Sequence, residues 1–268
     1  MMEAKNKGTV LKILVAVSFV AMVIVNYLAQ MLPINGVNPG QVSDSMPNLF
    51  APAGLTFSIW GLIYLSLAAF SVYQFSFKKQ DADPSLLDKV RGVFVVSSLV
   101  NIAWIFSWHY GSIGLSVLLM LTLLLSLIVI HLILDKAPLS KAGKVFYRLP
   151  FSLYFGWITV ATVANITAFL VRAGWDRFGW PEQAWAVIIL LVAMVIGTAT
   201  MVIRKDIAYG LVLVWAYIGI LIKHVSQGNF AGAYPGVIVT VIACLVIYVA
   251  AEGYNIYITR KAQANHPI

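Results

Sequence analysis

The sequence predicts an all-α polytopic membrane protein with eight transmembrane helices, and its composition carries the prediction. The chain has 268 residues, of which 61% are hydrophobic and only 10% are charged. A soluble domain carries about 25% charged residues, so this chain has too few to cover a surface that faces water. Its apolar residues also gather in eight runs, and a run of about 20 such residues is long enough to cross a bilayer.

The eight runs follow one another along the chain, and each is predicted to be a helix, because a helix satisfies its own backbone hydrogen bonds in lipid. The first is too long for the apolar part of a signal peptide, and no A-x-A cleavage site follows it, so we expect it to stay as a helix. The third and seventh are the shortest. The predicted spans are 10–32, 54–77, 92–108, 113–134, 149–171, 184–203, 207–222 and 235–258.

Lysine and arginine are distributed unevenly among the connections. With the N-terminus in the cytoplasm, 15 of the 18 Lys and Arg residues fall in cytoplasmic segments and three in outer segments. Positive residues stay on the cytoplasmic side, so both termini are expected there. The net charge of +8 is therefore a topology signal, and it does not indicate a nucleic-acid partner. This bias, without a transit-peptide pattern, suits a prokaryotic plasma membrane.

Residues that support chemistry are scarce. The single cysteine, Cys244, allows no intrachain disulfide and excludes zinc patterns built on several cysteines. No Ser-His-Asp set, P-loop or HExxH motif occurs, so we predict neither catalytic residues nor a metal site nor a required cofactor. His131 and Glu252 fall near cytoplasmic helix ends, where solvation is easy, and Lys223 and His224 at an outer end are expected to reach toward water.

Ionisable residues are also missing from the middle of the predicted spans. No Asp, Lys or Arg falls near the midplane of any of them. A proton- or ion-coupled transporter usually carries such a residue, so its absence argues against that class.

Aromatic and amide side chains form stripes on the second, third and fifth predicted helices. Spacings of three, four, seven and eight residues place each set on one helix face. At a rise of 1.5 Å per residue, Trp60, Asn101 and Asn165 lie about 9–10 Å below the outer edge. The stripes consist of Trp60 and Tyr64; Asn101, Trp104 and Trp108; and Trp157, Ala161 and Asn165.

Two interpretations of these stripes are open. In one, Asn101 and Asn165 are hydrogen-bond glue between helices and the Trp residues fill the bundle. In the other, the stripes line a pocket in which Trp faces stack on a flat apolar ligand and amides fix its polar edge. The outer loop 33–53, rich in turn signals and without Lys or Arg, would lie above that pocket. Trp108, Trp175, Trp180 and Trp185 are expected to form an interfacial belt.

Three segments at these positions resemble the TspO/MBR family, the tryptophan-rich sensory proteins that include the mitochondrial translocator protein. Pro52 followed by FSIWGLIY resembles the family's paired prolines and F-x-x-V-W-x-x-L-Y. Asn101-Ile-Ala-Trp104 resembles N-x-A-W, and YFGWITVATVAN from Tyr154 to Asn165 resembles Y-L-x-W-x-x-F-A-T-x-L-N. Three matches in the family's order favour the interpretation as a pocket over the interpretation in which these residues only join the helices.

The resemblance implies a five-helix bundle over 1–171, with a pocket under the first loop that takes tetrapyrroles such as protoporphyrin, or sterols in some members. The last three helices, in 172–268, have no counterpart in that five-helix fold and are predicted to form a membrane extension, an oligomer contact or a separate unit. The family's second proline is Ala51 here, a frequent Trp is Gly54, and a proline of the fifth helix is Leu153. The implied ligand-binding residues are Trp60, Tyr64, Asn101, Trp104, Trp157, Ala161 and Asn165.

Three functions stay open. The first is a membrane receptor or sensor that binds a flat apolar ligand of tetrapyrrole type, with loop 33–53 controlling access. The second is a permease for small amphipathic solutes, and the third is an enzyme that modifies a bound porphyrin. The sequence favours the non-enzymatic receptor, and the expected partners are a small apolar ligand, membrane lipid and, where the chain self-associates, a second copy in a homodimer.

Overall fold

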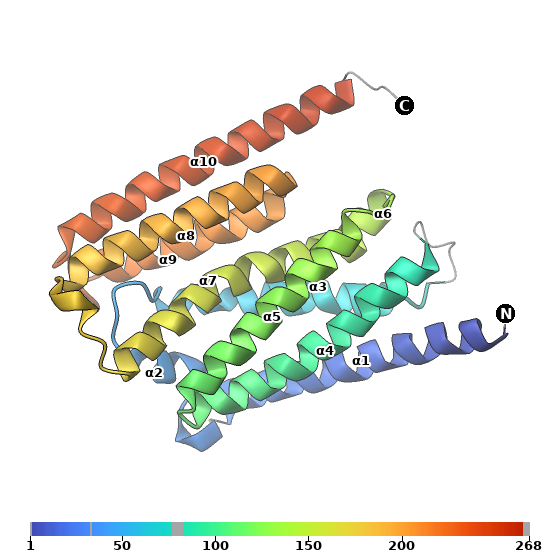
Figure 1. Ribbon diagram of the computed structural model, residues 1–268, viewed down its shortest axis with the longest axis horizontal. Helices are drawn as coiled ribbons and strands as arrows, with labels where there is room; N and C mark the ends of the chain where they lie inside the picture. The colour runs from blue at the N-terminus through green and yellow to red at the C-terminus, as the bar shows by residue number, and fades with distance from the viewer. Residues whose placement is uncertain (1, 33, 77–82, 265–268) are drawn as a thin grey trace. The chain divides into compact units, whose positions relative to one another are not determined.

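The computed structural model describes residues 2–32, 34–76 and 83–264, and this part of the chain consists of helices and turns with no β-strand (Figure 1). Eight of its helical segments are long and apolar enough to cross a membrane. The prediction of an all-α polytopic membrane protein is therefore confirmed. The eight segments are Gly8–Met31, Gly54–Tyr73, Pro84–His109, Ile113–Leu134, Lys141–Arg172, Glu182–Arg204, Ile207–Val225 and Pro235–Lys261.

The third span is longer than the sequence suggested. Its helix, α4 (Pro84–His109), begins where the side chain of Asp83 accepts a hydrogen bond from the backbone N–H of Ser85 at 2.9 Å. An Asp cap followed by Pro in the first helical position is a strong start signal. Arg91, which we expected in a cytoplasmic connection, consequently lies inside the helix.

The chain folds into two compact units. The first comprises Met1–Ser45 and Ile59–Ile158, and the second comprises Met46–Ser58 and Thr159–Ile268. The division falls inside α7 (Leu149–Arg172), so this helix contributes residues to both units. The predicted domains, 1–171 and 172–268, divide the chain at a different place and stay a prediction.

In the first unit, α4 packs on both α1 (Met2–Met31) and α5 (Ile113–Leu134), and α1 also packs on α3 (Ile59–Tyr73) (Figure 1). The chain reaches α7 through the short α6 (Lys141–Gly143) and a π-helical turn, η3 (Lys144–Arg148). Phe70 of α3 makes edge-to-face contacts with Phe94, Tyr147 and Phe151 at centroid distances of 5.3, 5.5 and 5.0 Å. Each such pair contributes about 0.5–1.5 kcal/mol beyond its buried area, so the cluster fixes how these elements pack.

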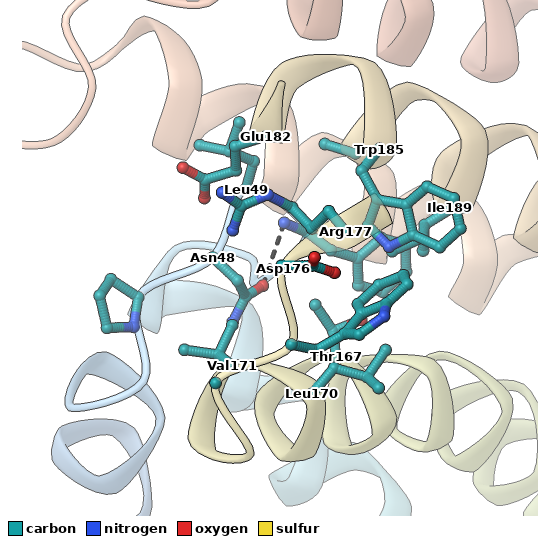
Figure 2. A pocket seen from close by; sticks show the side chains of 15 residues that line it. Asn48, Leu49, Thr167, Leu170, Val171, Asp176, Arg177, Glu182, Trp185 and Ile189 are labelled. Carbon is teal, nitrogen blue, oxygen red and sulfur yellow. Dashed lines mark hydrogen bonds between the residues drawn. The ribbon is translucent and has the colours of Figure 1, made fainter. Parts of the chain in front are cut away.

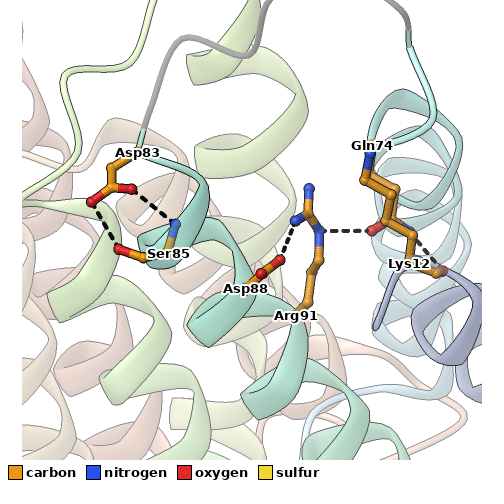
Figure 3. Close-up of polar contacts among 6 residues, drawn as sticks. All are labelled: Lys12, Gln74, Asp83, Ser85, Asp88 and Arg91. Atoms are coloured by element: carbon orange, nitrogen blue, oxygen red, sulfur yellow. Dashed lines mark hydrogen bonds and ion pairs between the residues drawn. The ribbon is translucent and has the colours of Figure 1, made fainter. Parts of the chain in front are cut away.

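A buried arginine ties together three helices of the first unit (Figure 3). Arg91 of α4 is only 2% exposed, and its Nη1 lies 2.6 Å from the carboxylate of Asp88. Its Nε donates to Oε1 of Gln74 at 3.2 Å, and the Gln74 amide donates to the main-chain carbonyl of Lys12 on α1 at 3.3 Å. The charge therefore has a counter-ion and hydrogen-bond partners from within the protein, as a buried charge requires.

The first part of loop 33–53 is ordered against α4. It contains the one-turn η1 (Ile34–Gly36) and a short helix, α2 (Pro39–Asp44), whose capping box joins Asn38 and Gln41. The indole N–H of Trp108 donates to the main-chain carbonyl of Pro39 at 3.2 Å. Trp108 is 6% exposed, so its expected place in an interfacial belt is wrong, because α2 covers it.

In the second unit, α8 (Glu182–Arg204), α9 (Ile207–Val225) and α10 (Pro235–Ala264) pack against one another (Figure 1). A short 3₁₀ turn, η4 (Arg177–Gly179), precedes α8. Gly197 of α8 lets the helices approach closely, because a Cβ there would lie 2.6 Å from Leu213 and 2.9 Å from the hydroxyl of Tyr248.

The segment before α3 belongs to the second unit and lies along α9. Its 3₁₀ turn, η2 (Gly54–Ser58), packs on α9, and the N–H of Ala53 donates to the carbonyl of Gly219 at 3.0 Å. The indole N–H of Trp215 donates to the carbonyl of Thr56 at 2.9 Å. A side chain at Gly219 would collide with Thr56, so the glycine is what allows this contact.

Candidate functional site

An aromatic cluster forms in the first unit between α3 and α7. Trp60, in the first turn of α3, stacks on Tyr64 with ring centroids 5.3 Å apart and planes 21° apart. Its ring also contacts Tyr154 and Trp157 in T-shaped geometry, with centroid distances of 5.8 and 6.2 Å. Tyr154 and Trp157 are buried, whereas Trp60 and Tyr64 keep part of their surface exposed. The cluster thus presents two half-exposed aromatic rings on a buried aromatic base.

Asn101 is the centre of a hydrogen-bonded relay in the same unit. Its Oδ1 accepts from the amide of Asn26 on α1 at 2.7 Å, and its Nδ2 donates to the hydroxyl of Tyr154 on α7 at 3.1 Å. The amide of Asn26 also donates to the carbonyl of Met22. Because Tyr154 contacts Trp60 as well, the relay joins α1 and α4 to the aromatic cluster.

Two members of this site, Asn26 and Tyr154, were not among the residues that the sequence singled out. Asn26 is an amide in the apolar stretch of the first span, and polar residues at such depth are costly unless they are paired. Tyr154 lies three residues before Trp157 and therefore on the same helix face. Both signals were present in the sequence.

Trp104 lies on α4 one turn after Asn101, toward the C-terminal end of the helix. Its ring stacks on Trp108 with centroids 5.9 Å apart and planes 22° apart. Its indole N–H is buried and has no hydrogen-bond partner within the described residues. An unused donor of this kind is costly in an apolar setting, so it is available to an acceptor on a ligand.

The remaining predicted residues, Ala161 and Asn165, lie one and two turns beyond Trp157 along α7. They fall in the part of α7 that belongs to the second unit. Asn165 is buried and Ala161 is half-buried. The structure thus brings Trp60, Tyr64 and Trp157 into contact and links Asn101 to them through Tyr154, whereas Ala161 and Asn165 belong to the other unit.

The second unit contains a cavity of about 380 Å³ that the sequence did not indicate (Figure 2). Ligand pockets occupy about 300–1,000 Å³, so its size is at the small end of that range. None of the seven predicted site residues lines it. Its lining comes from residues 47–50, from the end of α7 and the following loop, and from the start of α8.

Two tryptophans form an aromatic wall of this cavity, with Asp176, Arg177 and Glu182 also in its lining (Figure 2). The rings of Trp175 and Trp185 meet edge to face at a centroid distance of 4.7 Å. We expected both to lie in an interfacial belt, and that expectation stays a prediction. The adjoining loop is strained, because Arg177 and Phe178 adopt φ angles of 60° and 55°, which cost non-glycine residues about 1–3 kcal/mol each.

Three polar residues that we expected near solvent are buried. His131 packs its ring on Phe155 at 5.1 Å. His224 contacts the carbonyl of Leu49 through Nε2 at 2.9 Å, and Glu252 is 6% exposed. The expectation of solvation is therefore wrong for His131, His224 and Glu252, because helices and the segment before η2 cover them.

The described residues contain no group of three or more His, Cys, Asp or Glu side chains that could hold a metal ion. The polar groups of the aromatic cluster are amides, phenols and indoles. Such groups suit hydrogen bonding and stacking with an organic ligand.

A family model described as TSPO-like protein matches residues 12–254 of the chain. The chain belongs to this family. The match begins in α1 and ends in α10, so it includes the three last helices that the motif resemblance had left without a counterpart. Neither the curated proteins nor the solved structures yielded a match. The TSPO-like assignment and the eight apolar helices make the chain an integral membrane protein of TSPO type.

Proposed function

We propose that this TSPO-like protein is a membrane receptor or sensor that binds a flat apolar ligand of tetrapyrrole type at the aromatic cluster around Trp60. One observation carries the proposal: Trp60 and Tyr64 are stacked within 21° of parallel and half-exposed, above the buried rings of Tyr154 and Trp157. Half-exposed parallel rings offer flat apolar surface to a planar ligand, and aromatic stacking contributes about 0.5–1.5 kcal/mol per pair.

The residues around the cluster take different roles in this proposal. Trp60 and Tyr64 stack with the ligand, Trp157 supports them from beneath as a buried ring, and the unpartnered indole N–H of Trp104 donates to an acceptor at the ligand's edge. Asn101 already bonds to Asn26 and Tyr154, so it contributes by holding Tyr154 in place.

The sequence also assigned Ala161 and Asn165 to the pocket, but both belong to the second unit, so their part in ligand binding stays a prediction. The loop 33–53 controls access. As a receptor, the protein does not alter its ligand chemically, and it requires no cofactor.

We also propose the orientation and location of the chain. With 15 of 18 Lys and Arg residues on one side, both termini lie in the cytoplasm of a prokaryotic plasma membrane. The ends of α1 and α4 near loop 33–53 then face outward.

A titration of the purified protein in detergent with protoporphyrin IX tests the proposal. Porphyrin absorbance is followed, because a tryptophan signal would change with the substitutions themselves. We expect saturable binding that Trp60→Leu weakens about tenfold, which corresponds to about 1.4 kcal/mol. Trp180→Leu is the matched control, because Trp180 is 53% exposed and lies outside the cluster.

A third variant separates the two candidate sites. Trp185→Leu changes the cavity in the second unit and leaves the aromatic cluster intact. Binding that fails in Trp185→Leu but survives in Trp60→Leu would move the site to the cavity. Absorbance that never saturates, or that responds equally in all three variants, would contradict tetrapyrrole binding at the cluster.

A further inference from the structure

Three buried oxygen atoms on α10 lack a donor. Glu252 is 6% exposed, and neither of its carboxylate oxygens has a hydrogen-bond partner among the described residues. Asn255 is fully buried, and its Oδ1 is also without a partner there. Residues three apart lie on the same helix face, so the three oxygens face one region of the second unit.

This region is where α8 ends and α9 begins. The amide of Asn255 donates to the carbonyl of Met201 at 3.1 Å, and the same carbonyl accepts from the N–H of Asp206 at 3.1 Å. The carboxylate of Glu252 lies directly against Gly210 of α9, where any side chain would collide with it. The three helices are therefore joined at this point, with α10 lying along both α8 and α9 (Figure 1).

A second carboxylate lies close by. Asp206 caps the start of α9, is buried, and accepts a hydrogen bond from the N–H of Tyr209 at 3.1 Å. Its backbone N–H shares the Met201 carbonyl with the amide of Asn255, and Gly210, against which Glu252 lies, is one turn further along α9. Two buried carboxylates in one junction repel each other unless a positive charge lies between them.

The other charged and titratable groups of these helices leave Glu252 without a partner. Tyr209 donates its hydroxyl to Thr159 at 3.3 Å, and Tyr248 donates to the carbonyl of Ala193 at 3.4 Å. Arg204 is half-buried and Lys205 is exposed at the end of α8. Within the part of the chain that the structure describes, no ion pair reaches Glu252.

A carboxylate inside a membrane span is costly unless it is paired or takes up a positive charge. Carboxylate and amide oxygens accept hydrogen bonds but do not donate them, so another acceptor cannot be their partner. Oxygen ligands of this kind suit small, hard cations. We propose that Glu252 and Asn255, with Asp206 beside them, bind a small positive charge, namely an alkali-metal cation or a proton.

The proposal goes beyond ligand binding at the aromatic cluster and uses none of its residues. It gives the last three helices a role of their own. A charge bound among α8, α9 and α10 ties them together, so its arrival and departure change the stability of this junction. It also revises the sequence-based argument against ion dependence, because the sequence placed Glu252 near solvent.

Thermal unfolding of the purified full-length protein tests the proposal. It is measured in NaCl, KCl and choline chloride at equal ionic strength, and in choline chloride over a series of pH values. For a metal cation, the Tm of the wild type rises by several degrees in NaCl or KCl and scales with the logarithm of the cation concentration. For a proton, the Tm is equal in all three salts and depends on pH.

Glu252→Gln identifies the residue responsible. Its amide N–H₂ supplies the missing donor, so we expect a Tm that responds to neither salt nor pH beyond the response of the remaining groups. Glu182→Gln is the matched control, because Glu182 is exposed in the first turn of α8, and it should respond as the wild type does.

Two results would overturn the proposal. One is a wild-type Tm that is the same in all three salts and at every pH. This result can be obtained even if no variant folds. The other is a Glu252→Gln protein that keeps the full wild-type response. These Tm measurements do not depend on porphyrin binding, whether the wild type binds porphyrin or Trp60→Leu loses that binding. Failure of one proposal can therefore be distinguished from failure of the other.

Discussion

Arg91 in the first unit and Glu252 in the second are both ionisable, both buried and both within apolar spans, yet their surroundings differ. Arg91 has the Asp88 carboxylate at 2.6 Å and Gln74 at 3.2 Å (Figure 3). Glu252 has no hydrogen-bond partner within the described residues. A buried charge with protein partners holds helices together, whereas one without them is costly unless it takes up a proton or a cation.

The buried amides repeat this contrast. Asn101 uses both ends of its side chain, accepting from Asn26 and donating to Tyr154. Asn255 uses only its N–H₂ group, toward Met201, and leaves Oδ1 without a donor. The first unit therefore satisfies its buried polar groups internally at these positions, and the second leaves oxygen atoms for something else to complete.

The largest effect is expected from Asp88→Asn, which removes the counter-ion of Arg91. Breaking a buried ion pair costs about 3–5 kcal/mol because the remaining charge is unpaired. Asp88 is 26% exposed, so water offsets part of the loss and we expect about 2–3 kcal/mol of lost unfolding free energy. Unfolding in a mixed-micelle denaturant series measures it.

Asp83→Asn is the matched control for that measurement. This substitution makes the same chemical change five residues earlier, at the cap of the same helix. Asn caps helices as well as Asp does, so the cost should stay within about 0.5 kcal/mol. Equal effects at the two positions would show that the Arg91 pair contributes nothing to stability.

A smaller effect is expected from Asn101→Ala, which leaves the hydroxyl of Tyr154 and one donor of Asn26 without their partner. The loss of a buried partner costs about 2 kcal/mol.

Asn255→Ala should cost about 1 kcal/mol in choline chloride, because its Oδ1 makes no bond to lose and Met201 still accepts from Asp206. Asn229→Ala at an exposed position is the control.

If Asn255→Ala destabilises the protein as much as Asn101→Ala does, the contrast between the two amides breaks. The Asn255 side chain would then have a partner of its own in the protein. If the cost at Asn255 grows in NaCl or KCl while that at Asn101 stays constant, the contrast sharpens in favour of a bound cation.

The sequence was sufficient to predict the spans because hydropathy depends on composition alone. It also predicted the stripe of Trp60 and Tyr64, since helix periodicity is local. Hydropathy was less reliable for the ends of the spans: it left Arg91 outside the third span, because α4 begins at the Asp83 cap, eight residues before the expected position 92. Glu252 was misjudged for a different reason: its burial depends on Gly210 of another helix, and no local pattern reveals that approach.

The smallest effect is expected at Asp83, an exposed carboxylate whose partners are local. Backbone and side-chain hydrogen bonds from Ser85, at 2.9 and 2.8 Å, lower the pKa of Asp83 below its ordinary value of 3.8. The folded state therefore gains stability above pH 3.8 and loses it as the pH falls through the lowered value. Ser85→Ala removes the hydroxyl bond and keeps the backbone bond, so the pKa should move only part of the way back.

The titration of the Asp83 carboxyl carbon by NMR in detergent measures this shift. The midpoint should be higher in Ser85→Ala than in the wild type and still below 3.8. An identical midpoint in both proteins would mean that the backbone N–H alone stabilises the charge. Because Asp83 is solvated, its titration should leave the junction of α8, α9 and α10 unchanged, and that makes it a baseline against which the pH response of Glu252 is measured.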